Sequence, residues 1–321
     1  MKRVIVTGAS GWIGSHALAF LVERGYEVHA VAHRGASAAA RGVEWHRADL
    51  LNESDVMPIL ERVRPTHLLH LAWYAEPGKY QMSEQNYVWC RAGINLLRAF
   101  AAAGGGRAVF AGSCFEYDHS EGMCSETETR CAPTTRYGAC KLALSEVVTR
   151  PPGDLSTAWG RIFYLYGPGE HPSRLVPSVI ESLLRDQPAR CTHGRQLRDY
   201  LHVADVASAF AAILDGEVEG TVNIGSGEEV TVRALVEMIA DAVGAPRSML
   251  EFGAIAAAPG DSPRVVADVR RLRDEVNFRP RWWLRDGLAQ TVEWWRSRES
   301  GASERPRNKP ISSAARSSST R

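Results

Sequence analysis

Short apolar runs alternate with helix-length amphipathic segments through the first half of the chain. The apolar runs predict strands at Arg3–Thr7, Glu27–Ala32, Val43–Arg47, His67–Leu71, Ala108–Ala111 and Thr157–Arg161. The segments between them predict helices at Trp12–Glu23, Glu53–Arg62, Glu84–Ala103 and Tyr137–Thr149. This alternation is typical of βαβ units, whose right-handed crossovers produce a doubly wound parallel sheet. The pattern therefore predicts an α/β fold.

The pattern loosens after Gly167. Helices are still predicted at Val206–Leu214 and Val232–Val243, but the segments around them are rich in Pro, Gly and Arg. We therefore expect residues 1–167 to form the main sheet domain. Residues 168–296 are expected to form mainly a smaller, partly interleaved lobe, with some segments returning to the core of the sheet domain.

Composition is that of an ordinary globular protein. The 321 residues include 45% hydrophobic and 23% charged residues, and 38 basic side chains stand against 37 acidic ones. A nucleic-acid groove would need a clear basic excess, and a membrane span would need about 20 consecutive apolar residues. We expect neither, and we expect a cytoplasmic location. Residues 297–321 are rich in Ser and Arg with few apolar residues, so we expect a disordered tail.

The six cysteines form no CxxC pair, and His119 and His193 have no ligand spacing around them. Scattered cysteines of this kind are usually reduced and structural. We therefore expect no metal site.

The first predicted strand leads directly into a glycine-rich turn that opens a helix. In such a turn one glycine permits the bend, one lets the backbone approach a pyrophosphate, and one allows close helix packing. The helix N-terminus also presents free N–H groups to the phosphates. The turn thus predicts a dinucleotide-binding Rossmann sheet, with a plain strand–turn–helix joint as the alternative. The cofactor-binding residues predicted here are Gly8, Ser10, Gly11, Trp12, Ile13 and Gly14.

The end of the second strand bears on which dinucleotide is bound. An acidic residue there would accept hydrogen bonds from the ribose of NAD, whereas an arginine would accommodate the 2′-phosphate of NADP. The strand ends in Ala32, His33 and Arg34, which favours NADP(H). NAD(H) stays an alternative, because Arg34 can equally be a solvated loop residue. Asp49, followed by Leu50, is placed either to receive the adenine amino group or to cap the next helix.

Tyr137 and Lys141 lie four residues apart, and so on one face of a predicted helix. They follow a fifth strand that ends near Ser113. With these motifs the chain resembles the extended short-chain dehydrogenases/reductases, a family of nucleotide-sugar epimerases, dehydratases and ketoreductases. The resemblance runs from about Lys2 to Arg296. It rests on the glycine motif, His70-Leu71-Ala72, Ser113, Tyr137 with Lys141, Arg161, Tyr166-Gly167-Pro168-Gly169, and the segment from Arg198 to Val206.

The resemblance implies a catalytic set of Ser113, Tyr137 and Lys141. Tyr137 would be the acid–base catalyst, although the ordinary pKa of tyrosine, about 10, is too high for this work. Lys141 and the cationic nicotinamide would favour the phenolate and lower that pKa. Lys141 would also bind the nicotinamide ribose, and Ser113 would hold the reacting oxygen. Leu71 and Ala72 are further implied cofactor contacts.

The resemblance also implies a nucleotide-diphosphate sugar as the substrate. Arg198 and Arg264 match positions that hold the diphosphate, a task suited to guanidinium groups. Asn86 matches an asparagine near the active site, with an ordinary surface residue as the alternative. Asp205 is interpreted as a helix cap. The other implied substrate contacts are Trp73, Cys114, Phe115, Tyr164 and Val176.

Two departures from the family pattern narrow the chemistry. The 4,6-dehydratases carry at least one acid directly after the catalytic serine or threonine, where this chain has Cys114 and Phe115. Glu116 comes one residue later and is expected to face the other side of the strand, so dehydration is disfavoured. Tyr164 stands where many members have an asparagine, which changes the expected substrate pose.

The absence of an acid at Ala32 and the presence of Arg34 favour a reductase. We expect NADPH-dependent reduction of an NDP-4-keto-6-deoxyhexose at C4, a step of deoxysugar biosynthesis. A nucleotide-sugar 4-epimerase with tightly bound NAD is the second hypothesis. A non-catalytic NADP-sensing regulator is the third.

A homodimer is also implied by the resemblance. Relatives pack the helices predicted here at Glu84–Ala103 and Tyr137–Thr149 into a four-helix bundle. Burial of spare apolar surface on these helices would supply the driving force. The residues taken to form this surface are Leu96, Leu97, Phe100, Leu142 and Leu144.

Overall fold

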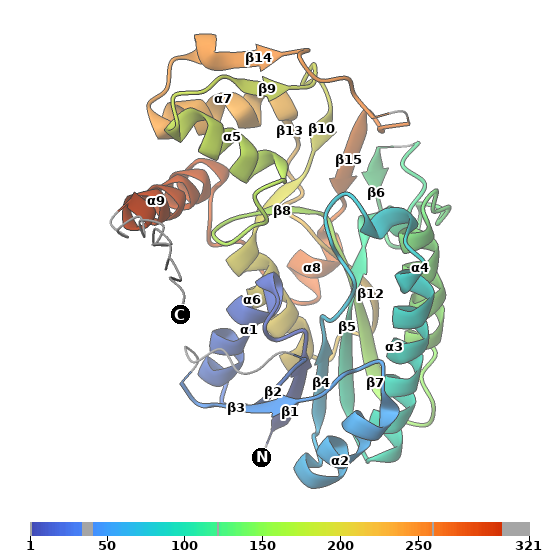
Figure 1. Cartoon of the computed structure of the whole chain (residues 1–321). Helices are drawn as coiled ribbons and strands as arrows, with labels where there is room; N and C mark the ends of the chain where they lie inside the picture. Colours follow the sequence, from blue (N-terminus) through green and yellow to red (C-terminus); the bar gives the residue numbers. More distant parts are fainter. Residues whose placement is uncertain (1, 34–40, 121, 259, 304–321) are drawn as a thin grey trace, which may run out of the picture.

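The computed structural model describes residues 2–33, 41–120, 122–258 and 260–303, and a parallel sheet lies at its centre (Figure 1). Within these residues the sheet has seven strands in the order β12-β7-β5-β4-β1-β2-β3, and each neighbouring pair is parallel. The predicted doubly wound sheet is therefore confirmed. The strands are β1 (Arg3–Thr7), β2 (Glu27–Ala32), β3 (Val43–Arg47), β4 (His67–His70), β5 (Arg107–Ser113), β7 (Ser156–Ile162) and β12 (Gly220–Ile224).

Helices cover both faces of the sheet, which is why its central strands are apolar and buried. One face packs against α1 and α6, and the other against α2, α3 and α4 (Figure 1). The chain passes from β3 back across β1 to β4, so the strand order reverses between β1 and β4. Ligands of such sheets bind at this reversal, beyond the carboxyl ends of the strands. The helices are α1 (Trp12–Glu23), α2 (Glu53–Val63), α3 (Gln85–Ala102), α4 (Arg136–Val148) and α6 (Val203–Asp215).

A smaller lobe lies beyond the carboxyl ends of the strands, at the top of Figure 1. Its core is formed by α5 (Leu175–Leu184), α7 (Val232–Val243) and α9 (Leu284–Ser303). Short strands and helices complete the lobe and its junction with the sheet domain. These are η1 (Tyr80–Met82), η2 (Cys114–Glu116), β6 (Met123–Cys124), β8 (Tyr164–Tyr166), β9 (Ala189–Cys191), β10 (Leu197–Arg198), β11 (Tyr200–His202), β13 (Val230–Thr231), η3 (Arg247–Met249), β14 (Leu250–Phe252), β15 (Arg264–Ala267) and α8 (Arg270–Asp274).

Two segments of the second half return to the sheet domain. The helix α6 packs against α1, and β12 adds the outermost strand beside β7. The last described helix, α9, runs to Ser303. It therefore continues past Ser297, where the sequence predicts the disordered tail to begin, so that prediction is wrong for residues 297–303. Residues 304–321 lie outside the described part of the chain.

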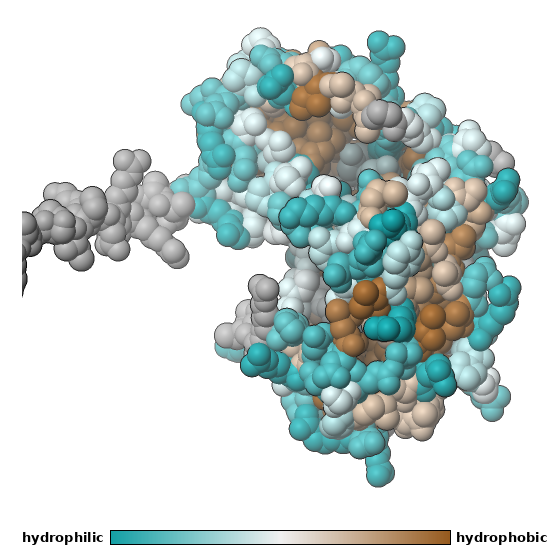
Figure 2. All heavy atoms as spheres, turned by 45° about the vertical axis from the view of Figure 1, so that its right-hand side comes forward, coloured by the Kyte–Doolittle hydropathy of each residue, from teal (hydrophilic) through white to brown (hydrophobic). Residues whose placement is uncertain are grey.

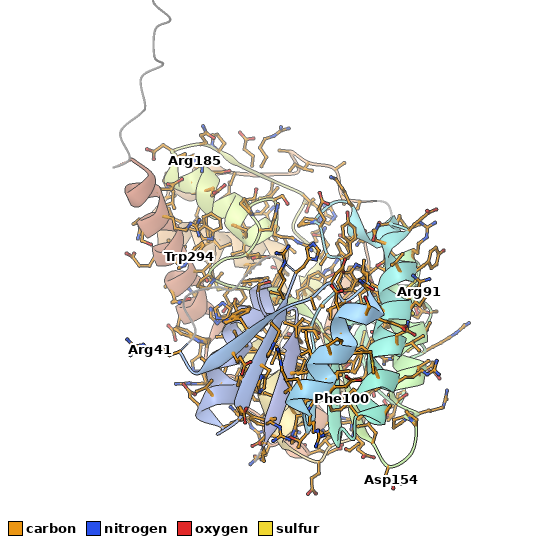
Figure 3. All side chains as sticks on the ribbon, turned by 60° about the horizontal axis from the view of Figure 1, so that its bottom comes forward. Arg41, Arg91, Phe100, Asp154, Arg185 and Trp294 are labelled. Atoms are coloured by element: carbon orange, nitrogen blue, oxygen red, sulfur yellow. The ribbon has the colours of Figure 1, made fainter. Side chains whose placement is uncertain are left out.

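The helices α3 and α4 use most of their large apolar side chains inside the protein. Leu96, Leu97, Phe100 and Leu144 are buried against the sheet, so the prediction that they form spare outer surface is wrong. Figure 2 turns this side of the molecule forward and shows other apolar patches among hydrophilic side chains. In Figure 3 Phe100 lies inward of α3, while Arg91 of the same helix points outward.

No described helix has the length and apolar character that crossing a membrane requires.

Candidate active site

The carboxyl end of β1 and the first turn of α1 form a narrow glycine cradle. Gly8 has a φ of +70°, and a Cβ on it would lie 2.6 Å from the backbone nitrogen of Ala72. A Cβ on Gly14 would lie 2.1 Å from the carbonyl oxygen of Gly8, and one on Gly11 would lie 3.0 Å from it. Only glycine therefore fits the tightest positions of this turn, as a backbone that approaches a pyrophosphate requires.

The start of α1 is suited to an anion. Gly11 is its N-cap and supplies no side-chain hydrogen bond, and the first turn contains no acidic residue. The backbone N–H groups and the positive end of the helix dipole are thus left for phosphates. Trp12 donates a hydrogen bond from Nε1 to the carbonyl oxygen of Pro168 at 2.7 Å, which joins the cradle to the segment before α5.

The other residues predicted to bind the cofactor lie around the cradle and differ in solvent exposure. Ser10 is exposed, whereas Ile13 and Leu71 are partly buried against the core on the α1 face of the sheet. Ala72 is buried and forms the wall that meets Gly8. The structure therefore brings these predicted cofactor residues together, and the cradle fits a nicotinamide dinucleotide.

The adenosine end of the site is only partly described. His33 is exposed, and its Nδ1 lies 4.0 Å from Oδ2 of Asp49. Arg34 lies outside the described residues. The interpretation of Asp49 as a helix cap is wrong, because the N-cap of α2 is Asn52, whose side chain accepts from the N–H of Ser54. Leu50 is partly buried against the core on the other face.

Ser113, Tyr137 and Lys141 come together where β5 ends and α4 begins. Ser113 is the last residue of β5, and its hydroxyl lies beside the phenol of Tyr137. Lys141 lies one helical turn after Tyr137 and is buried. Its Nζ donates to the carbonyl oxygen of Ala111 at 2.7 Å and lies 3.7 Å from the ring centroid of Trp73.

Burial controls the charge of this catalytic set. It lowers the pKa of Lys141 to about 7, because an ammonium loses hydration there. Burial raises the pKa of Tyr137 above its ordinary value, and the hydrogen bond from Ser113 only partly opposes this. The expectation that Lys141 lowers the pKa of Tyr137 is therefore not met in the protein alone. At neutral pH the phenol keeps its proton and can donate it.

Aromatic side chains enclose the phenol of Tyr137. The ring centroid of Tyr80 lies 4.9 Å from that of Tyr137, and those of Trp73 and Phe115 each lie at 6.2 Å. Trp73 and Phe115 are predicted substrate contacts, and the structure places both at the catalytic tyrosine. Tyr80 is not predicted, because it lies in the short helix η1 where no periodic pattern marks it.

Asn86 is buried, so the alternative that it is an ordinary surface residue is wrong. Its amide donates to the carbonyl oxygens of Tyr80 and Ser83 at 2.6 and 2.8 Å. Its Oδ1 accepts from Nε1 of Trp73 at 2.9 Å. The side chain thus holds two of the aromatic walls in place and acts on the site through them.

Glu116 lies beneath the catalytic serine, in η2 and not in a strand. The prediction that it faces the other side of a strand is therefore wrong. Its carboxylate accepts from the N–H of Ser113 at 2.8 Å, from Nε1 of Trp159 at 3.0 Å and from Nε of Arg161 at 2.6 Å. This fully buried carboxylate supports the end of β5 and is occupied by these donors. The adjacent Cys114 is also buried.

The two arginines predicted to bind the diphosphate are each paired with a carboxylate of the lobe. Arg198 is buried, forms an ion pair with Asp261 and lies with its guanidinium carbon 5.3 Å from the ring centroid of Tyr164. Arg264 donates from Nε to Glu229 at 2.8 Å. To bind the two guanidinium groups, a diphosphate would have to displace these carboxylates.

Two further residues serve the structure of the lobe. Val176 is buried in the core that α5 shares with α7 and α9. Asp205 does not cap α6, whose N-cap is His202. Instead its carboxylate accepts from the N–H groups of Arg281 and Trp282, both at 3.0 Å, and so anchors the segment before α9.

Taken together, the cradle and the Ser–Tyr–Lys set are suited to hydride chemistry with proton transfer at one oxygen. Residues 4–225 match the model of the NAD-dependent epimerase/dehydratase family. The chain belongs to this family, within the extended short-chain dehydrogenases/reductases.

Similar proteins span almost the whole chain. A solved structure of MoeE5 in complex with UDP-glucuronic acid and NAD is 33% identical, with a TM-score of 0.79, and the match covers 92% of this chain and 99% of that one. A UDP-glucose 4-epimerase of Streptomyces lividans is 25% identical, covering 94% of this chain and 99% of the relative. A dTDP-4-dehydro-6-deoxy-D-allose reductase of a Streptomyces species is 26% identical, covering 92% and 96%.

Proposed function

We propose that this enzyme reduces the C4 ketone of an NDP-4-keto-6-deoxyhexose with NADPH. The observation that carries the proposal is the end of β2, where Ala32 and the exposed His33 place no carboxylate at the position that would bind the adenosine ribose of NAD. The absence of this acid supports NADPH, which a reductase consumes, over a tightly held NAD. Tyr137, enclosed by Tyr80, Trp73 and Phe115, is the group that would donate a proton to the carbonyl oxygen.

The residues of the chain divide the work as follows. NADPH, when bound in the glycine cradle, supplies the hydride. Ser113 orients the carbonyl oxygen of the substrate toward Tyr137, and the phenol donates its proton to that oxygen. Lys141 provides positive charge beside the phenolate that remains. Arg198 and Arg264 bind the diphosphate, and the aromatic walls exclude water from the reacting atoms.

A 4-epimerase is the second candidate, and it is supported by the similarity to the UDP-glucose 4-epimerase of Streptomyces lividans. An epimerase that works by oxidation and reduction at C4 must present both faces of the sugar ring to one cofactor. The sugar would then have to turn over beside Tyr137.

Dehydration is disfavoured by the surroundings of Glu116. Glu116 is the acid that follows Ser113 after the end of β5. Its carboxylate is buried and accepts hydrogen bonds from Ser113, Trp159 and Arg161. Cys114 is also buried, and burial raises the pKa of its thiol. Neither group is placed to remove a proton from a bound sugar.

The test measures NADPH oxidation with a panel of NDP-4-keto-6-deoxyhexoses that differ in nucleotide. Wild type should oxidise one NADPH per sugar reduced, and Tyr137→Phe should lose about 10²–10⁴ in turnover while binding NADPH normally. Tyr26→Phe is the matched control, because it removes another enclosed phenol hydroxyl just before β2, at the opposite edge of the sheet. Turnover in Tyr137→Phe equal to that of Tyr26→Phe would refute the assignment.

A further inference from the structure

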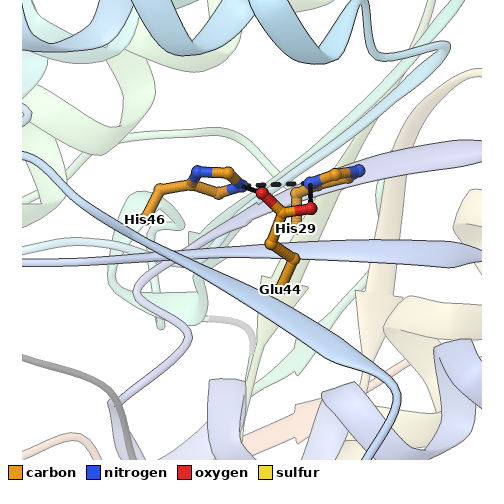
Figure 4. A group of neighbouring side chains, drawn as sticks. All are labelled: His29, Glu44 and His46. Atoms are coloured by element: carbon orange, nitrogen blue, oxygen red, sulfur yellow. Dashed lines mark hydrogen bonds and ion pairs between the residues drawn. The ribbon is translucent and has the colours of Figure 1, made fainter.

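Two buried histidines and a glutamate lie together on the strands β2 and β3, away from the catalytic set. The strand pairing sets His29 opposite Glu44 and Val31 opposite His46, so all three side chains project from the face that α2 covers. The ligand-type atoms of the three residues lie within 4.8 Å of one another (Figure 4). β5, which carries Ser113, is three strand spacings from β2, or about 14 Å, so this cluster is separate from the active site.

We propose that His29, Glu44 and His46 form a binding site for a divalent transition metal, with Zn²⁺ the ion that suits them best. Imidazole nitrogens and a carboxylate oxygen are ordinary zinc ligands. Ligands about 2.0–2.2 Å from a tetrahedral zinc are separated from one another by about 3.3–3.6 Å. Here Nδ1 of His29 lies 3.0 Å from Nε2 of His46, and Oε2 and Oε1 of Glu44 each lie 3.6 Å from one of these nitrogens. A small rotation of the exposed Glu44 carboxylate would bring one oxygen to both nitrogens.

The surroundings of the cluster also fit a metal. A ligating histidine usually donates its other ring N–H to a carboxylate, and Nε2 of His29 lies 3.1 Å from Oε1 of Glu27. Both histidine rings are almost fully buried, which fixes their orientation, whereas the side chain of Glu44 is 61% exposed. The exposed carboxylate leaves a path for an ion to enter and a fourth position for water.

The contact between Arg62 of α2 and His46 leads to a specific prediction about zinc binding. Its guanidinium, which can only donate, lies 2.6 Å from Nδ1 of His46, so this nitrogen accepts and Nε2 carries the proton. Zinc binding at Nε2 requires that proton to move to Nδ1. Arg62, which is exposed, must then leave Nδ1. Arg62→Gln, whose amide oxygen can accept from Nδ1–H, should therefore bind zinc at least as tightly as wild type.

The expectation that the chain holds no metal site was based on its cysteines and on His119 and His193. The present cluster arises instead from pairing between two strands, which places His29 beside His46. Glu44 and His46 are two residues apart on one strand and so share its face. A site of this kind does not depend on the proposed reductase activity.

The experiment titrates ZnCl₂ into the chelator-treated full chain without an affinity tag, by calorimetry with a competing chelator. We expect one tight zinc equivalent per chain. Glu44→Gln, an exposed change that leaves the fold intact, and Glu27→Gln should each weaken binding by roughly 10–100-fold. His29→Gln and His46→Gln should abolish the tight equivalent.

The controls are Glu61→Gln, which removes an exposed carboxylate from α2, and His193→Gln, which removes an exposed histidine from the lobe. Neither should change the affinity. If the buried histidine variants do not fold, the two glutamate variants and Arg62→Gln decide the result. Unchanged affinity in Glu44→Gln and Glu27→Gln, or several weak equivalents in place of one tight one, would overturn the proposal.

Discussion

Because of Lys141, the protein should become more stable as the pH rises. Burial lowers its pKa from 10.5 to about 7. Between these two values the unfolded chain binds a proton that the folded chain does not, so the free energy of unfolding rises with pH. The slope approaches about 1.4 kcal/mol per pH unit above the folded pKa, which amounts to about 2 kcal/mol between pH 7 and pH 9. Lys141→Met fills a similar volume without an ionisable group and should lose this component.

The assay is urea unfolding of the protein without cofactor, at pH 7, 8 and 9, for wild type and variant. The difference between the unfolding free energies of wild type and variant isolates the contribution of Lys141 to the pH dependence, because all other titrating groups are common to both proteins. Wild type should gain about 2 kcal/mol relative to Lys141→Met across this range. Lys79→Met removes an exposed lysine that pairs with Glu76 and should show no such gain. Parallel pH profiles for wild type and Lys141→Met would show that Lys141 stays charged in the folded protein, and would refute the reasoning.

Three further predictions concern the cofactor, the support of the catalytic serine and the assembly. Arg34→Ala should weaken NADPH binding far more than NADH binding in fluorescence titrations, and equal losses would show that Arg34 does not contact the 2′-phosphate. Glu116→Gln should lower the free energy of unfolding, measured in urea, by about 3–5 kcal/mol, because it leaves the buried Arg161 without its ion-pair partner. A loss below about 1 kcal/mol, which is typical of exposed ion pairs, would contradict this prediction. Sedimentation should give a homodimer at micromolar concentration. Tyr87→Glu, a change on the exposed side of α3, should raise the dissociation constant of the dimer at least about tenfold. A monomeric wild type would contradict the predicted assembly.

The main sheet was predictable because its signals are local. A β-branched apolar run such as β1, followed by a glycine turn and an amphipathic segment, specifies strand, turn and helix within a few residues. The bounds of α1 and α7 agree with the prediction for the same reason. By contrast α9 is rich in charged residues and α5 contains Pro177 in its first turn, so neither shows a clear helical pattern.

The site was predictable only as far as each residue carries its own motif. Tyr137 and Lys141 could be named from their spacing, and Ser113 from the family resemblance. The roles of Tyr80, Asn86 and Glu116 depend on long-range packing, which no local pattern encodes. The pairing of His29 with His46 depends on the register of β2 against β3, and register is set by the folded sheet.

Incubation with C4-deuterated NADPH tests the reductase assignment most directly. With an NDP-4-keto-6-deoxyhexose as substrate, the account predicts stoichiometric loss of NADPH absorbance and transfer of deuterium to C4 of the sugar. Tyr137→Phe should suppress both signals together. Interconversion of two NDP-hexoses without added cofactor, with no net change in absorbance, would contradict the account and establish the 4-epimerase in its place.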